Sequence, residues 1–263
     1  MVFVPEPAAA SYYTEIVLNP GNGASNVTQG QATYAAVLST TGSCGAAQAF
    51  ADLSHGAIGV ADSTLSSCGV SYTYGAYADA QAFDHWACAA GCSLLPASLN
   101  WVVSMSGTAA GDSTTESTFL FTDTISVNFQ TVYTVGVNVR YLGGTLTATA
   151  GLSDTGLVDG TPGVTTYPVT ISGNTFSVNL LASVLLPPLG FSSVMEATAV
   201  SNGSIDVYDP VQTSFTPQDP TVQFTSDGGD IAGGNTAPEP ASFLLLGTAL
   251  AALACRRHFI LLR

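Results

Sequence analysis

The chain has 263 residues, of which eighteen are acidic and four are basic, giving a formal net charge of −14. It contains no lysine, and residues 1–238 hold one arginine, Arg140. Binding to nucleic-acid phosphates or to anionic lipid needs clustered cations, and P-loop or Schiff-base chemistry needs a lysine, so the composition excludes these function classes.

The N-terminal segment 1–10, MVFVPEPAAA, has no basic n-region and an apolar stretch of only four residues. A secretory signal peptide needs a basic start and a longer apolar run, so this segment is not one as it stands. We expect that the true start lies further upstream and that Ala8, Ala9 and Ala10 are the remnant of a small-residue cleavage site. The alternative is a genuine start with a non-standard export route.

Four of the five cysteines fall within the first 92 residues: Cys44, Cys68, Cys88 and Cys92. An even set is typical of disulfides in an oxidising compartment, and three connectivities are open. The spacing favours Cys44–Cys68 and Cys88–Cys92, because the Ala-Ala-Gly loop between the last two can turn back on itself. The rival is a metal site of His85, Cys88 and Cys92, but this spacing matches no zinc pattern well and exported thiolates would oxidise.

Residues 11–225 predict one antiparallel β domain. Hydrophobic residues make up 46% of the chain, which is enough apolar surface for a folded core. Over residues 125–141 the odd positions are mostly apolar and the even positions mostly polar, the period-two pattern of a strand with one buried face. Such a strand would extend about 56 Å, so we expect a bend or bulge near Gln130 or Gly136.

Three dipeptides predict tight hairpin turns, namely Gly143-Gly144, Gly173-Asn174 and Asn202-Gly203. Each turn would place apolar side chains opposite one another: Tyr141 with Leu146, Ile171 with Phe176, and Val200 with Ile205. A short helix is also compatible with residues 83–92. Many short strands with few helices favour an all-β, antiparallel β-sandwich or jelly-roll-like domain. The alternative, a parallel β-helix, lacks the fixed-period repeat that it would need.

Residues 226–237 are rich in glycine and aspartate and predict a linker. Segment 238–263 then opens with Pro238, Glu239 and Pro240, continues with fifteen uncharged residues over 241–255, and reaches Arg256 and Arg257. As a helix, the uncharged run would span about 22 Å, against roughly 30 Å of hydrocarbon core. Snorkelling and local thinning would let it cross, with the arginines on the cytoplasmic side. A buried core helix is the alternative, which fits poorly because every face of the segment is apolar.

The order of these three parts resembles the PEP-CTERM sorting signal. Pro238–Pro240 matches the triplet of that signal, Phe243–Ala254 its helix and Arg256–Arg257 its basic cluster, while Phe259–Arg263 extends past the usual end. The resemblance implies a Gram-negative bacterium, Sec export, an inner-membrane-anchored intermediate and cutting near the triplet by an exosortase. It also implies a final place at the cell surface or in the extracellular matrix, with exopolysaccharide and biofilm, and nothing about the body.

The body offers little catalytic chemistry. His55 and His85 occur without a G-x-S-x-G elbow, and Glu15, Glu116 and Glu196 lie in no recognisable motif. We therefore expect that the protein is not an enzyme and uses no cofactor, with a secreted hydrolase as the third alternative.

A structural or adhesive role is the main prediction, and carbohydrate binding is its first alternative. Sugars stack on exposed aromatic rings, and the candidate stacking residues are Tyr72, Tyr74 and Trp86, for which packing in the core is the competing interpretation. The predicted partners are an exosortase, extracellular polysaccharide and, through the C-terminal helix before processing, the membrane. Two aspartate pairs in Gly-rich loops match no calcium-binding spacing, and solvated turns are the competing interpretation: Asp154 with Asp159, and Asp227 with Asp230.

Overall fold

The computed structural model describes residues 12–19, 26–30, 34–41, 44–64, 76–91, 96–187, 190–228 and 231–232. The chain divides into two units, residues 1–233 and 234–263. The second unit holds the predicted sorting signal and the predicted helix 241–255, and it lies outside the described residues. Within the described residues, one short 3-10 turn at Leu53–His55 interrupts the strands. No helix in this part of the chain is long and apolar enough to cross a membrane.

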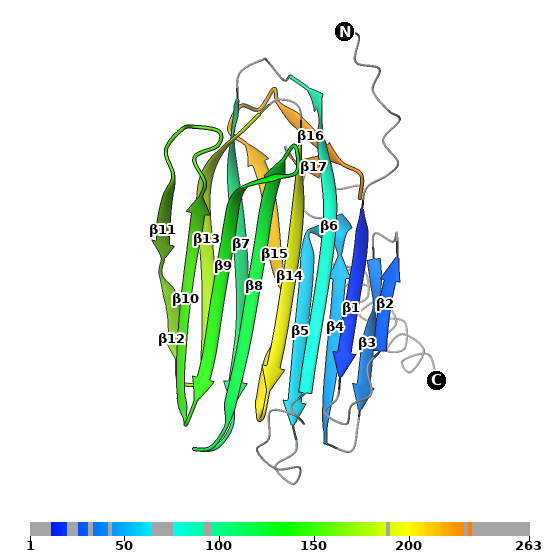
Figure 1. Ribbon diagram of the computed structural model, residues 1–263, viewed down its shortest axis with the longest axis vertical. Coiled ribbons are helices and arrows are strands. Elements are labelled where there is room, and N and C mark those ends of the chain that lie inside the picture. Colours follow the sequence, from blue (N-terminus) through cyan, green and yellow to red (C-terminus); the bar gives the residue numbers. More distant parts are fainter. Residues whose placement is uncertain are drawn as a thin grey trace, which may run out of the picture. The chain divides into compact units, whose positions relative to one another are not determined.

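Two antiparallel sheets form the described body (Figure 1). Sheet A has the order β11-β10-β9-β8-β14-β6-β1-β2, and β16 joins β6 and β17. Its strands are β1 (Tyr13–Asn19), β2 (Asn26–Gly30), β6 (Ala76–Ala90), β8 (Glu116–Val127), β9 (Gln130–Leu142), β10 (Thr145–Asp154), β11 (Gly163–Tyr167), β14 (Phe191–Ser201), β16 (Gln223–Ser226) and β17 (Ile231–Ala232). Within the segment predicted as a linker, β17 therefore pairs with β16.

Sheet B has the order β12-β13-β7-β15-β5-β4-β3. Its strands are β3 (Tyr34–Thr41), β4 (Gly45–Asp52), β5 (Ala57–Thr64), β7 (Ala97–Ala110), β12 (Val169–Ser172), β13 (Thr175–Leu186) and β15 (Ser204–Pro217). The two sheets pack face to face, so the predicted antiparallel all-β sandwich is confirmed.

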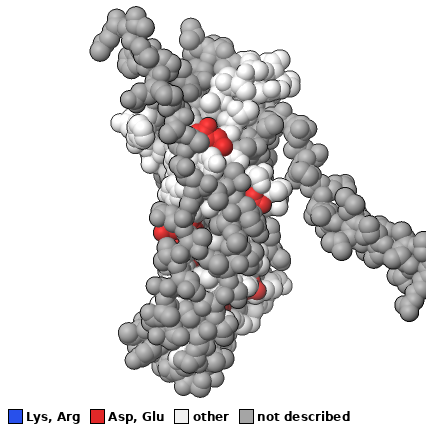
Figure 2. Space-filling view, turned by 90° about the vertical axis from the view of Figure 1, so that its right-hand side faces the viewer, with Lys and Arg blue, Asp and Glu red and all other residues white. Residues whose placement is uncertain are grey.

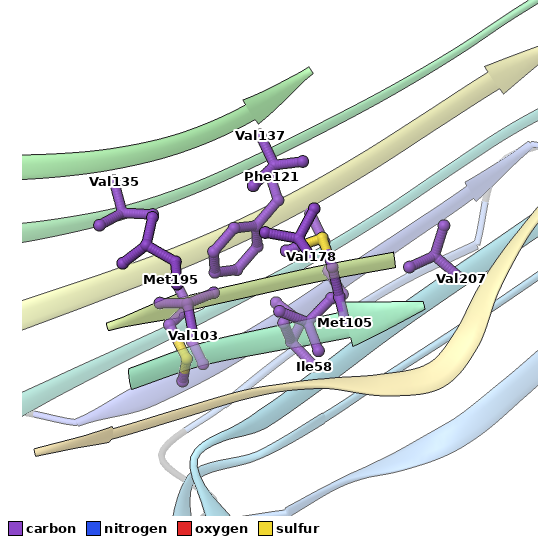
Figure 3. Close-up of a cluster of buried hydrophobic side chains, with 14 of the residues drawn as sticks. Ile58, Val103, Met105, Phe121, Val135, Val137, Val178, Met195 and Val207 are labelled. Atoms are coloured by element: carbon purple, nitrogen blue, oxygen red, sulfur yellow. The ribbon is translucent and has the colours of Figure 1, made fainter. Parts of the chain in front are cut away.

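The hydrophobic core lies between the inner faces of the two sheets. Val103, Met105 and Val178 of sheet B point toward Phe121 and Val135 of sheet A (Figure 3). All five are at most 5% exposed. Alternation produces this core, because successive side chains of a strand point to opposite faces, and only one face of each strand here is apolar.

Two of the three predicted hairpins are confirmed. Gly143-Gly144 joins β9 to β10 and pairs Tyr141 with Leu146. Gly173-Asn174 joins β12 to β13 and pairs Ile171 with Phe176. Gly143 and Gly144 have φ of 56° and 86°, the left-handed values that a two-residue hairpin turn requires and that glycine adopts without steric strain.

The third predicted hairpin, at Asn202-Gly203, is wrong. The strands on either side belong to different sheets, β14 to sheet A and β15 to sheet B. Gly203 does not adopt positive φ, and a Cβ on it would lie 2.3 Å from Cγ2 of Thr115 and 2.6 Å from the carbonyl oxygen of Ala110. Glycine is needed here for close packing where the chain crosses between sheets, rather than for a hairpin turn.

The prediction of one long strand over residues 125–141 is also wrong, although a bulge does occur near Gln130. The chain reverses at Asn128 and Phe129, which have φ of 51° and 63°, and Val127 pairs with Gln130. A two-residue turn moves the buried face from odd to even positions, because the residues flanking the turn point to the same side. A bulge at Val132 moves it back, since Ile125 pairs with Tyr133 while Ser126 pairs with Thr131. The two shifts cancel, which leaves an unbroken alternation in the sequence.

The short helix considered for residues 83–92 is wrong as well, because residues 76–90 form strand β6. Its first half alternates alanine with larger side chains, and the alanines are the buried ones. Ala76, Ala78, Ala80 and Ala82 are all 0% exposed. Alanine carries little hydrophobic signal, so the buried face of this strand is hard to see in the sequence.

Candidate functional site

Trp86 lies in the core. Its side chain is 4% exposed, and its ring stacks on Phe191 with centroids 5.6 Å apart while Phe215 contacts it edge-on at 5.4 Å. The ring of Trp86 is therefore not at the surface where a sugar would stack. The other two candidate stacking residues, Tyr72 and Tyr74, lie outside the described residues.

Cys44 and Cys88 are both disulfide-bonded, and Cys68 and Cys92 lie outside the described residues. Next to Cys44, Gly45 pairs with Thr64, whose hydroxyl accepts a hydrogen bond from the N–H of Ala76 at the start of β6. Cys88 lies twelve residues beyond Ala76 in the extended strand β6, which places it about 40 Å from Ala76. The Cα atoms of two bridged cysteines lie within about 7 Å of each other. The two cysteines therefore belong to different bridges, and the preferred pairing stays a prediction.

The aspartates considered for calcium make contacts within the protein. Asp154 Oδ1 accepts from the N–H of Gly156 at 2.7 Å, and Asp159 Oδ1 accepts from the N–H of Thr161 at 2.8 Å. Asp227 Oδ2 lies 3.6 Å from Nδ1 of His85, and Asp230 lies outside the described residues. Among the residues that the structure describes, no group of three or more His, Cys, Asp or Glu side chains is placed to hold a metal ion.

A groove of about 490 Å³ lies on the outer face of sheet B. We call it the hydroxyl groove, because serine and threonine side chains dominate its lining. One row of outward-facing residues crosses six neighbouring strands at the same level: Ser172, Thr175, Thr108, Asp206, Ala61 and Gln48. A second row of hydroxyls lies two residues from the first along each of three strands: Thr170, Ser177 and Ser106.

Small residues also line the hydroxyl groove. Gly107 is one of them and lies opposite buried Phe176, so a Cβ on it would lie 2.8 Å from that core ring and 2.7 Å from the carbonyl oxygen of Asp206. Beyond Asp206, Ala61 leaves room for a second hollow of about 320 Å³, which shares Gln48, Thr108 and Asp206 with the first. The two hollows are therefore neighbours.

An aromatic pair stands at one wall of the groove. Tyr208 lines it and meets Phe50 edge to face, with ring centroids 5.1 Å apart. The Phe50 ring lies over Gly59, where a Cβ would approach to 2.4 Å. Strand β15 has irregular pairing between Val207 and Val211. Tyr208 faces the groove by ordinary alternation, since it lies two residues after the outward-facing Asp206.

The groove carries negative charge without a compensating cation. Asp206 is exposed, and its Oδ1 accepts from the N–H of Tyr208 at 3.0 Å. Arg140, the one arginine or lysine among the described residues, belongs to sheet A and lies 2.8 Å from Oε1 of Glu116. The described surface in Figure 2 likewise shows acidic side chains and neither lysine nor arginine. This charge disfavours anionic ligands.

The outer face of sheet A is different in character. Glu15 and Glu196 both pair with Gln81, on either side of it, and Asp79 lies two residues away on the same face. The pKa of Asp79 is raised to about 6, mainly by burial and also by the charges of Glu196 and Glu15, while a hydrogen bond from Thr198 opposes the rise. Three carboxylates thus repel one another here.

The family comparison concerns the C-terminal segment. The model of the PEP-CTERM protein-sorting motif matches residues 236–257. The chain carries a PEP-CTERM sorting motif. No curated protein and no solved structure is similar enough to the chain to count as a match. The sorting motif marks an exported protein with a membrane-anchored intermediate that an exosortase processes, and the body is not recognised as a member of any family.

In the body attached to this sorting motif, a polar cluster crosses the sandwich. Asp123 of β8 is 0% exposed and accepts hydrogen bonds from Thr213 (2.8 Å), Ser193 (3.0 Å) and Trp101 (3.2 Å). Burial raises its pKa to about 6, although these hydrogen bonds oppose the rise. Because Trp101 and Thr213 belong to sheet B, the cluster ties the two sheets together and is structural rather than a ligand site.

The sequence pattern alone does not reveal the hydroxyl groove. Its residues come from β4, β7, β12, β13 and β15, and only the strand order brings them together. The available signal is alternation of hydroxyl residues with residues that carry no polar side chain, as in Ser104, Ser106 and Thr108 or in Thr170 and Ser172. That alternation indicates a polar outer face, but it does not show which strands are neighbours.

Proposed function

We propose that this protein is a structural or adhesive component of an extracellular polysaccharide matrix, sorted to the cell surface by exosortase processing near Pro238–Pro240. The observation that carries the proposal is the sorting motif at residues 236–257, attached to a body that has one arginine and no lysine before residue 256. An acidic all-β body lacks the clustered cations that bind phosphate, and it suits a hydrated environment of neutral polar groups. Bridges Cys44–Cys68 and Cys88–Cys92 would stabilise it there by about 2–4 kcal/mol each.

Cell fractionation with mass spectrometry of the mature C-terminus tests this proposal. We expect a product that ends near Pro238–Pro240 and is recovered from the surface or matrix fraction. A matched variant with Pro238, Glu239 and Pro240 changed to alanine should stay in the membrane fraction with its C-terminus intact. Recovery of mature surface protein that still ends at Arg263 would exclude processing, and recovery of a cut product from a soluble internal fraction would exclude surface sorting.

A carbohydrate-binding module is the second candidate function, and the hydroxyl groove is the observation that favours it. Asp206 is the outward-facing carboxylate among the residues that line the groove, since the other acidic residue there, Asp62, is 4% exposed. Glycoside hydrolysis needs two carboxylates across a cleft, so the groove supports binding rather than catalysis. A glycan array probed with the full-length protein tests this candidate, and a time course showing release of reducing sugar would overturn the non-enzymatic role.

A further inference from the structure

Polar groups in the hydroxyl groove are arranged as a line across the strands. Neighbouring strands lie about 4.8 Å apart, so the row from Ser172 to Gln48 extends about 24 Å over six strands. The spacing of about 4.8 Å between neighbouring strands is close to the length of one sugar ring in an extended chain. A linear oligosaccharide lying across the strands would therefore place successive rings over successive strands.

The chemistry of the row matches hydroxyl groups. A serine or threonine hydroxyl both donates and accepts, and the amide of Gln48 does the same through two atoms. Sugar hydroxyls also donate and accept, so each contact can be satisfied in either direction. An apolar ligand would leave these groups without hydrogen bonds, and an anionic chain would approach Asp206 with no cation of the groove to offset the repulsion.

Tyr208 supplies an aromatic surface at the wall of this row. Its ring is half-buried, and the contact with Phe50, itself seated over Gly59, limits its rotation. An aromatic ring gives a large contact area to the C–H face of a sugar. Because the ring and the strand-borne hydroxyls are already held in position, little conformational entropy is lost when a ligand binds.

We infer that the hydroxyl groove binds a neutral glycan chain laid across the strands of sheet B, with Tyr208 as the stacking surface and Thr108, Asp206 and Gln48 as hydrogen-bonding groups. The inference rests on the proposed function only for the source of the glycan, which would be the surrounding matrix. It assigns the binding to residues other than Tyr72 and Tyr74, which lie outside the described residues.

Affinity electrophoresis of the full-length protein in mild detergent tests this inference. The gels contain neutral polysaccharides, namely a β-glucan, a xylan, a mannan or a galactan, and parallel gels contain a polyuronate or chitosan. We expect saturable retardation by at least one neutral polymer that does not change with salt concentration. Tyr208→Ala should weaken it about tenfold, and Thr108→Ala about fivefold.

The matched control is Thr149→Ala, which removes an exposed strand hydroxyl from the outer face of sheet A and should leave retardation unchanged. Circular dichroism of each variant establishes that the sheets are intact. Asp206→Asn adds a second arm, because it replaces a carboxylate that only accepts with an uncharged amide. Retardation by the neutral polymer should weaken about twofold to fivefold, and retardation by the polyuronate should appear because the repelling charge is gone.

Three results would overturn the inference. These are no retardation by any neutral polymer, retardation that Tyr208→Ala and Thr108→Ala leave unchanged, and retardation by chitosan alone that salt abolishes. If any of them occurs while fractionation still places the processed protein in the matrix, only the groove assignment fails. If the groove binds but the protein remains internal and uncut, only the proposed function fails.

Discussion

The two halves of the sandwich are built from different side chains. In the half around β4 and β6, which we call the alanine half, alanines point inward: Ala47, Ala49, Ala51, Ala78, Ala80 and Ala82. In the half around β7, β8 and β9, which we call the large-residue half, the inward side chains include Trp101, Phe119, Phe121, Val135 and Val137. Both sets are buried, at 2% exposure or less.

This difference changes the spacing of the sheets and the position of the aromatic residues. Cα atoms of β4 and β6, on opposite sheets, come within 8 Å of each other, closer than the roughly 10 Å at which sheets usually pack. In the alanine half some rings lie on the outer faces, although Trp86 of β6 points into the core. Tyr13 stacks on Phe83 on sheet A, and Tyr208 contacts Phe50 on sheet B. The large-residue half uses its rings for packing, as the buried Trp101, Phe119 and Phe121 show.

The largest expected effect comes from removing a ring from the large-residue half. Trp101→Ala deletes a side chain with 0% exposure and removes a donor from buried Asp123. We expect the free energy of unfolding to fall by about 3–5 kcal/mol, measured by urea denaturation followed by circular dichroism. Trp101→Phe keeps a ring and should lose less. A loss under about 1 kcal/mol for Trp101→Ala would show that the half is not tightly packed.

The next effect is the pH dependence that Asp123 adds to the same half. Its folded pKa of about 6 lies above the value of about 3.9 in an unfolded chain, so the folded state binds the proton more tightly. The contribution of Asp123 to stability is therefore fully present below about pH 4 and is lost, by about 3 kcal/mol, as the pH rises through 6. Burial also raises the pKa of Asp62 and Asp84, which act in the same direction.

Asp123→Asn is the variant that isolates this contribution. An asparagine keeps an acceptor for Thr213 and does not titrate, so its stability should change less between pH 4 and 7 than that of the unmodified protein. Thermal or urea unfolding at several pH values measures the difference. Identical pH profiles for the two proteins would contradict the assignment to Asp123.

Enlarging a side chain in the alanine half should have a smaller effect. Ala80→Leu inserts extra carbons at a position that is 0% exposed, where the sheets lie close together. We expect a loss of about 1–3 kcal/mol from overpacking, measured by the same denaturation. Ala110→Leu, on an exposed alanine of β7, is the matched control and should change stability little. If Ala80→Leu stabilised the protein, the alanine half would have unfilled volume.

The smallest effect concerns the β8–β9 turn of the large-residue half. Phe129 is fully exposed with φ of 63°, a left-handed conformation that is unfavourable for a bulky residue. Phe129→Gly should raise the free energy of unfolding by about 0.5–1 kcal/mol, since it relieves this strain and loses no packing. Asn128→Gly should gain less, because asparagine tolerates that conformation. A destabilised Phe129→Gly would mean that the phenylalanine makes a contact that its exposure hides.

Glycine chemistry and alternation predict a large part of the fold. The hairpins at Gly143-Gly144 and Gly173-Asn174 follow from turn glycines that adopt positive φ, namely Gly143, Gly144 and Gly173. The same reasoning fails at Asn202-Gly203, where glycine serves close packing against Thr115. It fails again at Phe129, where sheet pairing imposes a turn that the local residues do not favour. For the candidate site, alternation predicts polar outer faces but cannot show that Tyr208 lies beside Ser106.

The sequence by itself determined the properties that depend on composition and on contiguous residues. These are the acidic body, the period-two strands and the sorting motif, whose triplet, apolar run and arginines are read in order along the chain. Only the tertiary structure decided which strands are neighbours, that Trp86 is core, and that the hydroxyls of β7, β12 and β13 align with Asp206. The reason is that strand order depends on which apolar faces pack together across the whole chain, and no local pattern records that choice.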